Sequence, residues 1–272
     1  MLYGLVNFGI QRFIIFPSFL SLEREEAIKN VKRSAEAIQG EIHHLDILCH
    51  DWAAWDDTYE FIKSRSDNYF KSNLSLTSFT GSKINTIYFV DAKGKIIWGE
   101  SHELETGKII HLTEFPEDSF PPDHPLISYE SENKPLADIK VTGIYMTEKG
   151  PMLISSRPIL TSNIEGPVRG SVIFGRFLNE KIIKTLVNQT KVNFQTFPVM
   201  HGSLPEPVKD ISDRITDESR YLVEVSNHDN VDSYTTLTDI KGDPAFLIKS
   251  KTSKEISNKL LHSVEMIQKK LN

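Results

Sequence analysis

Arg157 is the side chain in this sequence with the clearest chemical requirement. It lies in an apolar segment directly before Pro158, so we expect it on a buried strand, where a guanidinium group needs an anionic partner. Two kinds of partner are open: a structural carboxylate such as Asp56 or Asp239, or a small carboxylate or similar anion bound as a ligand. For the second case, the candidate ligand-binding residues are Trp55, Asp56, Tyr88, Tyr145 and Arg157.

An aromatic and acidic block from Asp51 to Phe61 could also recognise a ligand. Its large side chains and the residue that follows recur at spacings of three, four and three, so on a helix they form one broad stripe: Trp52, Trp55, Tyr59 and Ile62. The carboxylates that flank this stripe are Asp51, Asp56 and Asp57. Such a surface suits a recognition wall for a small organic ligand, but tryptophans in a buried seam, with solvated or capping aspartates, are the simpler interpretation.

Catalytic and metal chemistry find little support in the sequence. The motifs of common hydrolases, dinucleotide-binding proteins and nucleotide-binding proteins are missing from the sequence, and adjacent carboxylates such as Asp56 and Asp57 point apart on a helix. His43, Asp46 and His50 share one helix face, but nothing supplies further metal ligands, so we expect a solvated face. We therefore expect that the protein is not an enzyme and binds no metal or cofactor. A hydrolase that uses the acidic block is the least favoured alternative.

Composition narrows the class of protein further. The chain has 272 residues, of which 39% are hydrophobic and 25% charged, which is ordinary for a globular protein. A net charge of -6 gives no basic footprint for nucleic acid. Cys49 is the single cysteine, so the sequence excludes an internal disulfide and a cysteine-rich metal site, and we expect this thiol to be packed in the core.

Two stretches at the start of the chain have a helical or membrane-like pattern. Residues 1–21 are apolar over roughly the length of a membrane span, so we expect an anchor segment, truncated or marginal because Arg12 lies near its centre. An amphipathic surface segment and a buried helix are the alternatives. Residues 22–52 carry a heptad seam and predict a stalk helix about 45 Å long. The seam could pair two copies in a homodimer, form a spine, or face the core of its own chain.

The rest of the chain predicts an α+β fold. We expect a short helix over 66–76, a loop over 75–83 and a main antiparallel sheet of five strands within 84–176, with helices on one side. The proline-rich residues 113–138 predict an irregular excursion over that sheet, where binding residues often lie. A second set of strands over 192–252 extends the sheet or forms a small second lobe, and residues 253–272 predict an amphipathic helix. The sensory domain is thereby expected over residues 22–252.

A family resemblance rests on four passages in order along the chain. They are Asp51 to Phe61; Asn85 to Gly94; Ser156 to Leu178 with Arg157-Pro158-Ile159 and Gly170 to Arg176; and Thr238 to Pro244 with Asp239-Ile240-Lys241-Gly242-Asp243-Pro244. Together they span roughly residues 20 to 255, and in this order they resemble the CHASE domain of the fourth class, an extracellular sensory domain of histidine kinases and diguanylate cyclases. The resemblance implies a ligand-sensing module with a PAS-like or Cache-like sheet.

The combined expectation is an extracytoplasmic domain, held at the cell membrane by its first segment, that senses an unidentified small molecule for a signal-transduction receptor of the two-component kind. It would transmit the bound state by a rearrangement of the stalk helix, as a homodimer through that helix. The chain would then be a fragment of a receptor or a stand-alone sensor. The alternative is a structural or adaptor module that acts by coiled-coil association and binds no ligand.

Overall fold

The computed structural model describes Ile10, Phe13 and residues 16–127, 134–199, 204–206, 208–216, 219–226 and 229–254. Most of the expected anchor segment, residues 1–21, and nearly all of the expected C-terminal helix, residues 253–272, lie outside the described residues. Among the helices that are described, none combines the length and the apolar character that crossing a bilayer requires.

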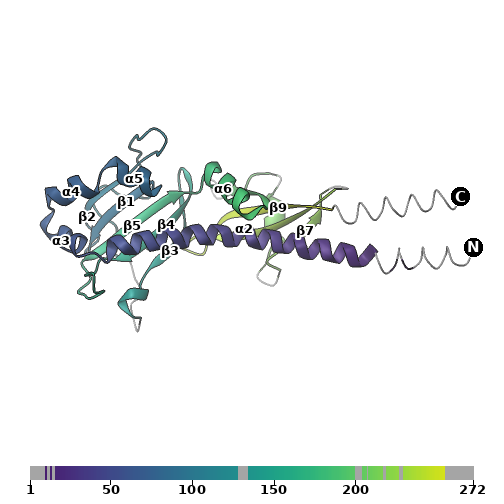
Figure 1. The fold of residues 1–272 in the computed structure, drawn as a ribbon, viewed down its shortest axis with the longest axis horizontal. Coiled ribbons are helices and arrows are strands. Elements are labelled where there is room, and N and C mark those ends of the chain that lie inside the picture. The colour runs from purple at the N-terminus through teal and green to yellow at the C-terminus, as the bar shows by residue number, and fades with distance from the viewer. Residues whose placement is uncertain are drawn as a thin grey trace, which may run out of the picture. The chain divides into compact units, whose positions relative to one another are not determined.

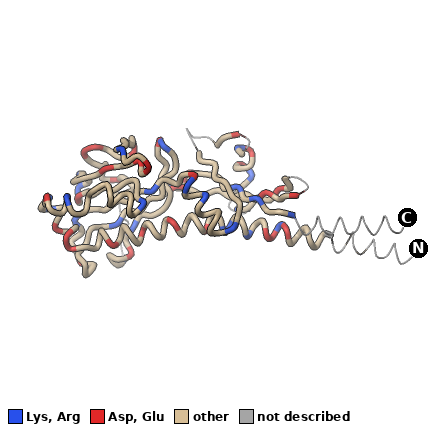
Figure 2. Tube along the Cα trace, turned by 45° about the horizontal axis from the view of Figure 1, so that its top comes forward, with Lys and Arg blue, Asp and Glu red and all other residues tan. Residues whose placement is uncertain are grey.

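The described chain divides into two compact units, coloured along the sequence in Figure 1. The five-stranded unit takes Ile38–Glu180 and Thr238–Ala245, and the four-stranded unit takes the residues up to Ala37, Lys181–Leu237 and those from Phe246 on. Charged residues of both signs are interspersed along the trace of each unit (Figure 2).

A long helix, α2, runs over Phe16–Ala53. The expected stalk helix is confirmed, although it begins earlier than predicted. Its seam residues are buried within the chain itself, with Val31, Ile38 and Leu45 all 0% exposed. The seam therefore faces the core of its own chain, which is one of the three roles left open, and a homodimer through α2 would need another face of the helix.

The aromatic block does not continue α2, and the prediction of a single helical stripe is wrong. Trp55 has extended backbone angles, φ −131° and ψ 129°, and a second helix, α3, begins after it at Asp56–Ser64. Trp52 packs on the sheet, with ring centroids 6.4 Å from Phe89 and 5.4 Å from Phe174. Trp55 lies beyond the break and is 36% exposed. The change of direction therefore separates the two tryptophans.

Two short helices follow. The expected helix is confirmed as α4, Asp67–Asn73, but residues 75–83 contain a further helix, α5, Leu76–Ser82, where a loop was expected. The serine, threonine and glycine content of that stretch favours a loop, yet Phe79 is fully buried and its ring lies 4.4 Å from that of His102. Burial of this one aromatic side chain outweighs the weak helix propensity of its neighbours.

The expected five-stranded antiparallel sheet is confirmed, with the strand order β2-β1-β5-β4-β3. Its strands are β1 Thr86–Asp91, β2 Ile96–Ser101, β3 Val141–Thr147, β4 Gly150–Pro158 and β5 Gly170–Phe177. Short turns join β1 to β2 and β3 to β4, and hairpins of this kind pair their strands antiparallel. β1 and β5 are antiparallel neighbours although they are distant in sequence.

Alternation along the strands gives this sheet two different faces. On the helix face, Phe89 contacts the rings of Trp52 on α2, Phe61 on α3 and Tyr69 on α4. On the opposite face, here called the loop face, the irregular segment 102–127 covers the sheet and supplies its own apolar residues to the core: Leu112, Phe115, Phe120 and Leu126. Among the described residues the helices therefore lie on one side of this sheet, as expected, and an irregular segment covers the other.

The second set of strands forms a separate sheet in the four-stranded unit, with the order β6-β9-β8-β7. These strands are β6 Asn193–Pro198, β7 Leu222–Val225, β8 Asn230–Thr238 and β9 Pro244–Ser253, and the helices α6 Glu180–Thr190 and α7 Lys209–Ser212 accompany them. Val208, Tyr234 and Leu247 form the buried centre of this unit. A short 3₁₀ helix, η2, at Leu136–Asp138 belongs to the five-stranded unit.

Candidate functional site

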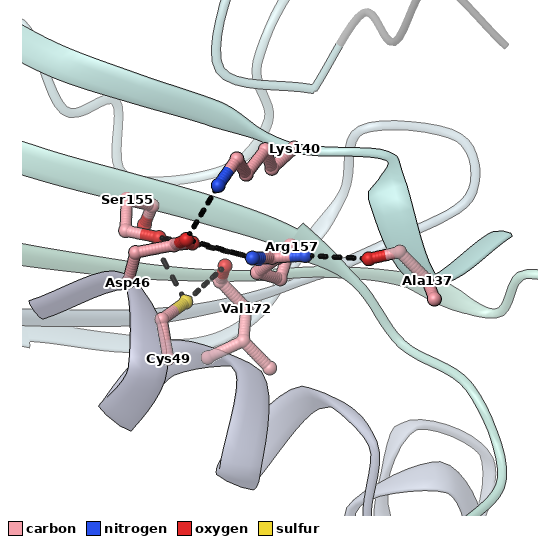
Figure 3. Close-up of polar contacts among 7 residues, drawn as sticks. All are labelled: Asp46, Cys49, Ala137, Lys140, Ser155, Arg157 and Val172. Atoms are coloured by element: carbon pink, nitrogen blue, oxygen red, sulfur yellow. Dashed lines mark hydrogen bonds and ion pairs between the residues drawn. The ribbon is translucent and has the colours of Figure 1, made fainter. Parts of the chain in front are cut away.

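Arg157 has a structural carboxylate as its partner, and that carboxylate is Asp46 of α2 (Figure 3). Its Nε and Nη2 atoms donate to the two oxygens of Asp46 at 2.7 Å each, and Nη1 donates to the carbonyl oxygen of Ala137 at 2.8 Å. Asp46 also accepts from Lys140 Nζ at 2.9 Å and from Ser155 Oγ at 3.0 Å. The guanidinium group is therefore engaged on the helix face, with neither of the partners suggested by the sequence.

Asp46 was expected on a solvated helix face, and this prediction is wrong, since the residue is only 2% exposed. Burial alone raises the pKa of the Asp46 carboxyl group, but the hydrogen bonds and charges of Arg157 and Lys140 outweigh that effect, so the pKa is lowered. Cys49, one turn later, is fully buried and donates to the carbonyl oxygens of Ser155 and Val172. Burial raises the pKa of its thiol to about 12. Both side chains bind α2 to the sheet.

Trp55 and Asp56 lie at the junction between α2 and α3. The ring of Trp55 is 6.0 Å from that of Tyr69, whose other neighbours are on the helix face. Asp56 makes a reciprocal pair with Ser162: its Oδ1 accepts from the backbone N–H of Ser162 at 2.9 Å, and its own N–H donates to Ser162 Oγ at 3.1 Å. The carboxylate thus fixes the start of α3 to the connection between β4 and β5.

Tyr88 and Tyr145 lie together on the loop face. The ring of Phe115 joins them, with centroids 5.0 Å from Tyr88 and 5.9 Å from Tyr145. Tyr88 lies directly over Gly99 of β2, where a Cβ atom would come within 2.2 Å of the ring. A glycine at position 99 therefore leaves the room that the ring of Tyr88 occupies.

The hydroxyl of Tyr145 meets His124 in a half-buried polar cluster. His124 Nδ1 accepts from the backbone N–H of Leu126 at 3.3 Å, so the neutral ring carries its proton on Nε2, which lies 3.3 Å from Tyr145 Oη. Burial lowers the pKa of His124, and the nearby Lys241 charge lowers it further. Burial, with Glu114 and Asp239 adding to it, raises the pKa of Tyr145 to about 12. The imidazole thus donates to a phenol that keeps its own proton.

The turn from Asp239 to Asp243 completes the edge of the loop face. Asp239 Oδ1 accepts from the backbone N–H groups of Lys241 and Asp243, which fixes the turn. Ile240 donates its N–H to the carbonyl oxygen of Ile144 on β3 at 2.9 Å. This contact brings Lys241 Nζ to 5.8 Å from the ring centroid of Tyr145. The turn from Asp239 to Asp243 therefore supplies both a backbone hydrogen bond to β3 and a cation near Tyr145.

The five candidate residues accordingly fall on two surfaces. Tyr88 and Tyr145 share the loop face, whereas Trp55, Asp56 and Arg157 lie with the helices on the other side of the sheet, so the structure does not bring all five together. The residues that do surround the two tyrosines were missed by reasoning from sequence: Glu114, Phe115, Phe120, His124 and Lys241. Four of them fall in the proline-rich segment and one in the Asp239 motif, and those two features were the available signals.

Comparison with known proteins agrees with this architecture. The sequence model of the CHASE4 domain matches residues 37–196, more than half of the chain. The methanogenesis regulatory histidine kinase FilI of Methanothrix harundinacea (strain 6Ac) is 25% identical over 231 residues, which are 84% of this chain and 24% of that protein. The chain thus spans about a quarter of the length of this curated relative.

Two solved structures share the fold. One is the extracellular domain of a protein assigned as the histidine kinase vpHK1S-Z8, with a TM-score of 0.52, 11% identity, and coverage of 89% of this chain and 95% of that one. The other is a domain of a protein from Vibrio parahaemolyticus assigned to the sensory box/GGDEF family, with a TM-score of 0.50, 11% identity, and coverage of 88% and 99%. With its PAS-like or Cache-like α+β fold, the chain is a sensor domain and belongs to the CHASE4 domain family.

Proposed function

We propose that this sensor domain binds a small organic ligand on the loop face of its five-stranded sheet. The observation that carries the proposal is the cluster of Tyr88, Tyr145 and His124, in which a buried tyrosine and two half-buried polar side chains lie among aromatic rings. Ligand sites in proteins combine apolar and aromatic walls with a few convergent polar groups of this kind. The anionic ligand expected from the sequence rested on Arg157, which loses that role because it binds Asp46.

The setting of this domain is part of the same proposal. The related protein from Methanothrix harundinacea is named as a histidine kinase, and a structural neighbour is an extracellular domain, which supports an extracytoplasmic sensor within a longer membrane receptor of the two-component kind. Membrane attachment would come from the apolar residues 1–21, which lie mostly outside the described part of the chain.

Strand β4 is the proposed route from the ligand to the helix. Its residues alternate between the two faces: Ile154 belongs to the core of the loop face, and Ser156 Oγ donates to the carbonyl oxygen of Leu126 at 2.5 Å. The residues between and after them, Ser155 and Arg157, both donate to Asp46 of α2. A ligand that shifts β4 would therefore shift α2, by as much as its affinities for the two arrangements differ.

The proposal is tested by screening purified chain against a library of small organic acids, amino acids, amines and sugars, using the thermal unfolding temperature as readout. We expect at least one compound to raise it, with a Kd that becomes about fivefold to tenfold weaker in Tyr145→Phe, the effect of one lost hydrogen bond. The matched control is Tyr234→Phe, because Tyr234 in the four-stranded unit is also buried and also has a lysine near its ring.

Two results would count against the proposal. One is a library in which no compound stabilises the chain. The other is a stabilising compound whose Kd is unchanged in Tyr145→Phe but weakened in Tyr234→Phe, which would locate binding in the four-stranded unit.

A further inference from the structure

One carboxylate oxygen on the loop face lacks a hydrogen-bond donor among the described residues. Glu114 Oε1 accepts from the backbone N–H of Glu148 at 2.7 Å, whereas Oε2 is buried and has no hydrogen-bond partner among the described residues. A buried carboxylate oxygen without a donor is costly, and in proteins such an atom normally finds a partner. The position of Oε2 therefore suits a donor that arrives with the ligand.

The surroundings of Glu114 are aromatic and negatively charged. The next residue, Phe115, meets Tyr145 edge to face, with an angle of 89° between the two rings. Glu114 and Asp239 lie close enough to the Tyr145 hydroxyl for both of their charges to disfavour its ionisation. Faces of aromatic rings attract organic cations, and carboxylates nearby strengthen that attraction. An anion would be repelled by the same two carboxylates.

One cation of the chain already lies at this place. Lys241 Nζ is 5.8 Å from the ring centroid of Tyr145, at the outer limit of a cation–π contact. Lys241 is exposed, and its ammonium group has no ion-pair partner within the part of the chain that the structure describes. This side chain is therefore weakly held and can leave the ring without breaking an ion pair.

We infer that the ligand of the loop face carries a protonated amine, which donates to Glu114 Oε2, lies near the ring of Tyr145 and displaces the Lys241 ammonium group from that ring. This inference rests on the proposed function, since it names the ligand class of the same site. It also gives the Asp239 motif a role, because Ile240 fixes Lys241 at the edge of β3 as a tethered competitor.

The experiment is calorimetric titration of the full chain with three probes of similar length, butylamine, butyrate and butanol, at pH 7.5. We expect butylamine to bind most tightly. Glu114→Gln keeps the oxygen that accepts from Glu148 and should weaken butylamine about tenfold or more, the effect of losing a charged hydrogen-bond partner. Lys241→Gln, at an exposed site, should strengthen it severalfold. Glu148→Gln is the control, because the exposed Glu148 carboxylate accepts only from the Thr113 hydroxyl in the described structure and should leave the Kd unchanged.

The inference is overturned if butyrate binds more tightly than butylamine, or if Lys241→Gln weakens the amine. The second result is informative even if Glu114→Gln fails to fold. Failure of the proposed function looks different, since none of the three probes, nor any compound of the wider library, would then respond to Tyr145→Phe.

Discussion

Replacing Asp46 by alanine should destabilise the five-stranded unit by about 3–5 kcal/mol, the cost of leaving one partner of a buried ion pair alone. Asp46 is 2% exposed and Arg157 is 8% exposed, so the guanidinium group left behind cannot recover hydration from bulk water. The variant also removes four accepted hydrogen bonds, from Arg157 Nε and Nη2, Lys140 Nζ and Ser155 Oγ. Lys140 contributes least, because its side chain is 40% exposed and remains solvated.

Tryptophan fluorescence during thermal unfolding is the suitable assay. All three tryptophans, Trp52, Trp55 and Trp98, belong to the five-stranded unit, so the signal reports that unit without contribution from the other. For a unit of about 150 residues, 1 kcal/mol corresponds to about 2–4 °C in Tm, which makes the expected loss about 6–20 °C.

Two further variants test whether the loss in Asp46→Ala comes from the buried ion pair. Glu60→Ala breaks an ion pair with Arg169 in which the Glu60 side chain is 66% exposed, and it should cost no more than about 1 kcal/mol. The double variant Asp46→Leu/Arg157→Met replaces the pair by apolar side chains and should recover most of the loss. If Asp46→Ala costs no more than Glu60→Ala, the pair does not hold α2 to β4.

Three other predictions concern single sites in the same unit. Cys49 should resist iodoacetamide at pH 8 in the folded chain and react only on unfolding, because burial raises its pKa to about 12; mass spectrometry reads the result, and rapid native labelling would refute it. Burial lowers the pKa of His124 in the folded state, so the unfolded chain binds more protons, and stability should fall as the pH drops below about 6.5. The slope between pH 7 and pH 5 should be smaller in His124→Gln, and an equal slope would contradict this. Gly99→Ala should cost about 1–3 kcal/mol by its clash with Tyr88, whereas Gly81→Ala in α5, with nothing within 4 Å, should be neutral or stabilising by up to about 1 kcal/mol.

The sequence predicted those parts of the fold whose signals are periodic. Alternation and turn residues predicted the five strands and their antiparallel pairing across short turns, and the seam over 22–52 predicted α2. The pairing of β1 with β5 was not predicted. The seam alone could not show which surface packs against it. Apolar residues at spacings of three and four are expected both for a helix that pairs with a second copy and for one that packs on the sheet of its own chain. Burial of Ile38 and Leu45 settles that question for the described chain.

The errors have local physical causes. The stripe of Trp52, Trp55 and Tyr59 fits one helix by spacing, but the extended backbone at Trp55 turns the chain. The helix at Leu76–Ser82 was missed because Phe79 is its only fully buried residue. At both places the chain contacts residues distant in sequence: Asp56 binds Ser162, and the ring of Phe79 lies against that of His102.

The candidate site was only half accessible to sequence reasoning. Tyr88 and Tyr145 were candidates because each lies on an expected strand. Alternation along a strand shows which residues share a face, but it does not show whether that face packs on the helices. Arg157 was expected to need an anion, and Asp46, 111 residues away, supplies it. His124 lies in a segment without periodicity, so no pattern pointed to its contact with Tyr145.

Hydrogen exchange, followed by mass spectrometry on the full chain with and without the most stabilising compound of the screen, tests the central claim most directly. A ligand on the loop face should slow exchange most in peptides from 102–127 and β3, while those from α3 and α4 stay unchanged. Slowing confined to α3 and α4, or to strands β6 to β9, would contradict binding on the loop face.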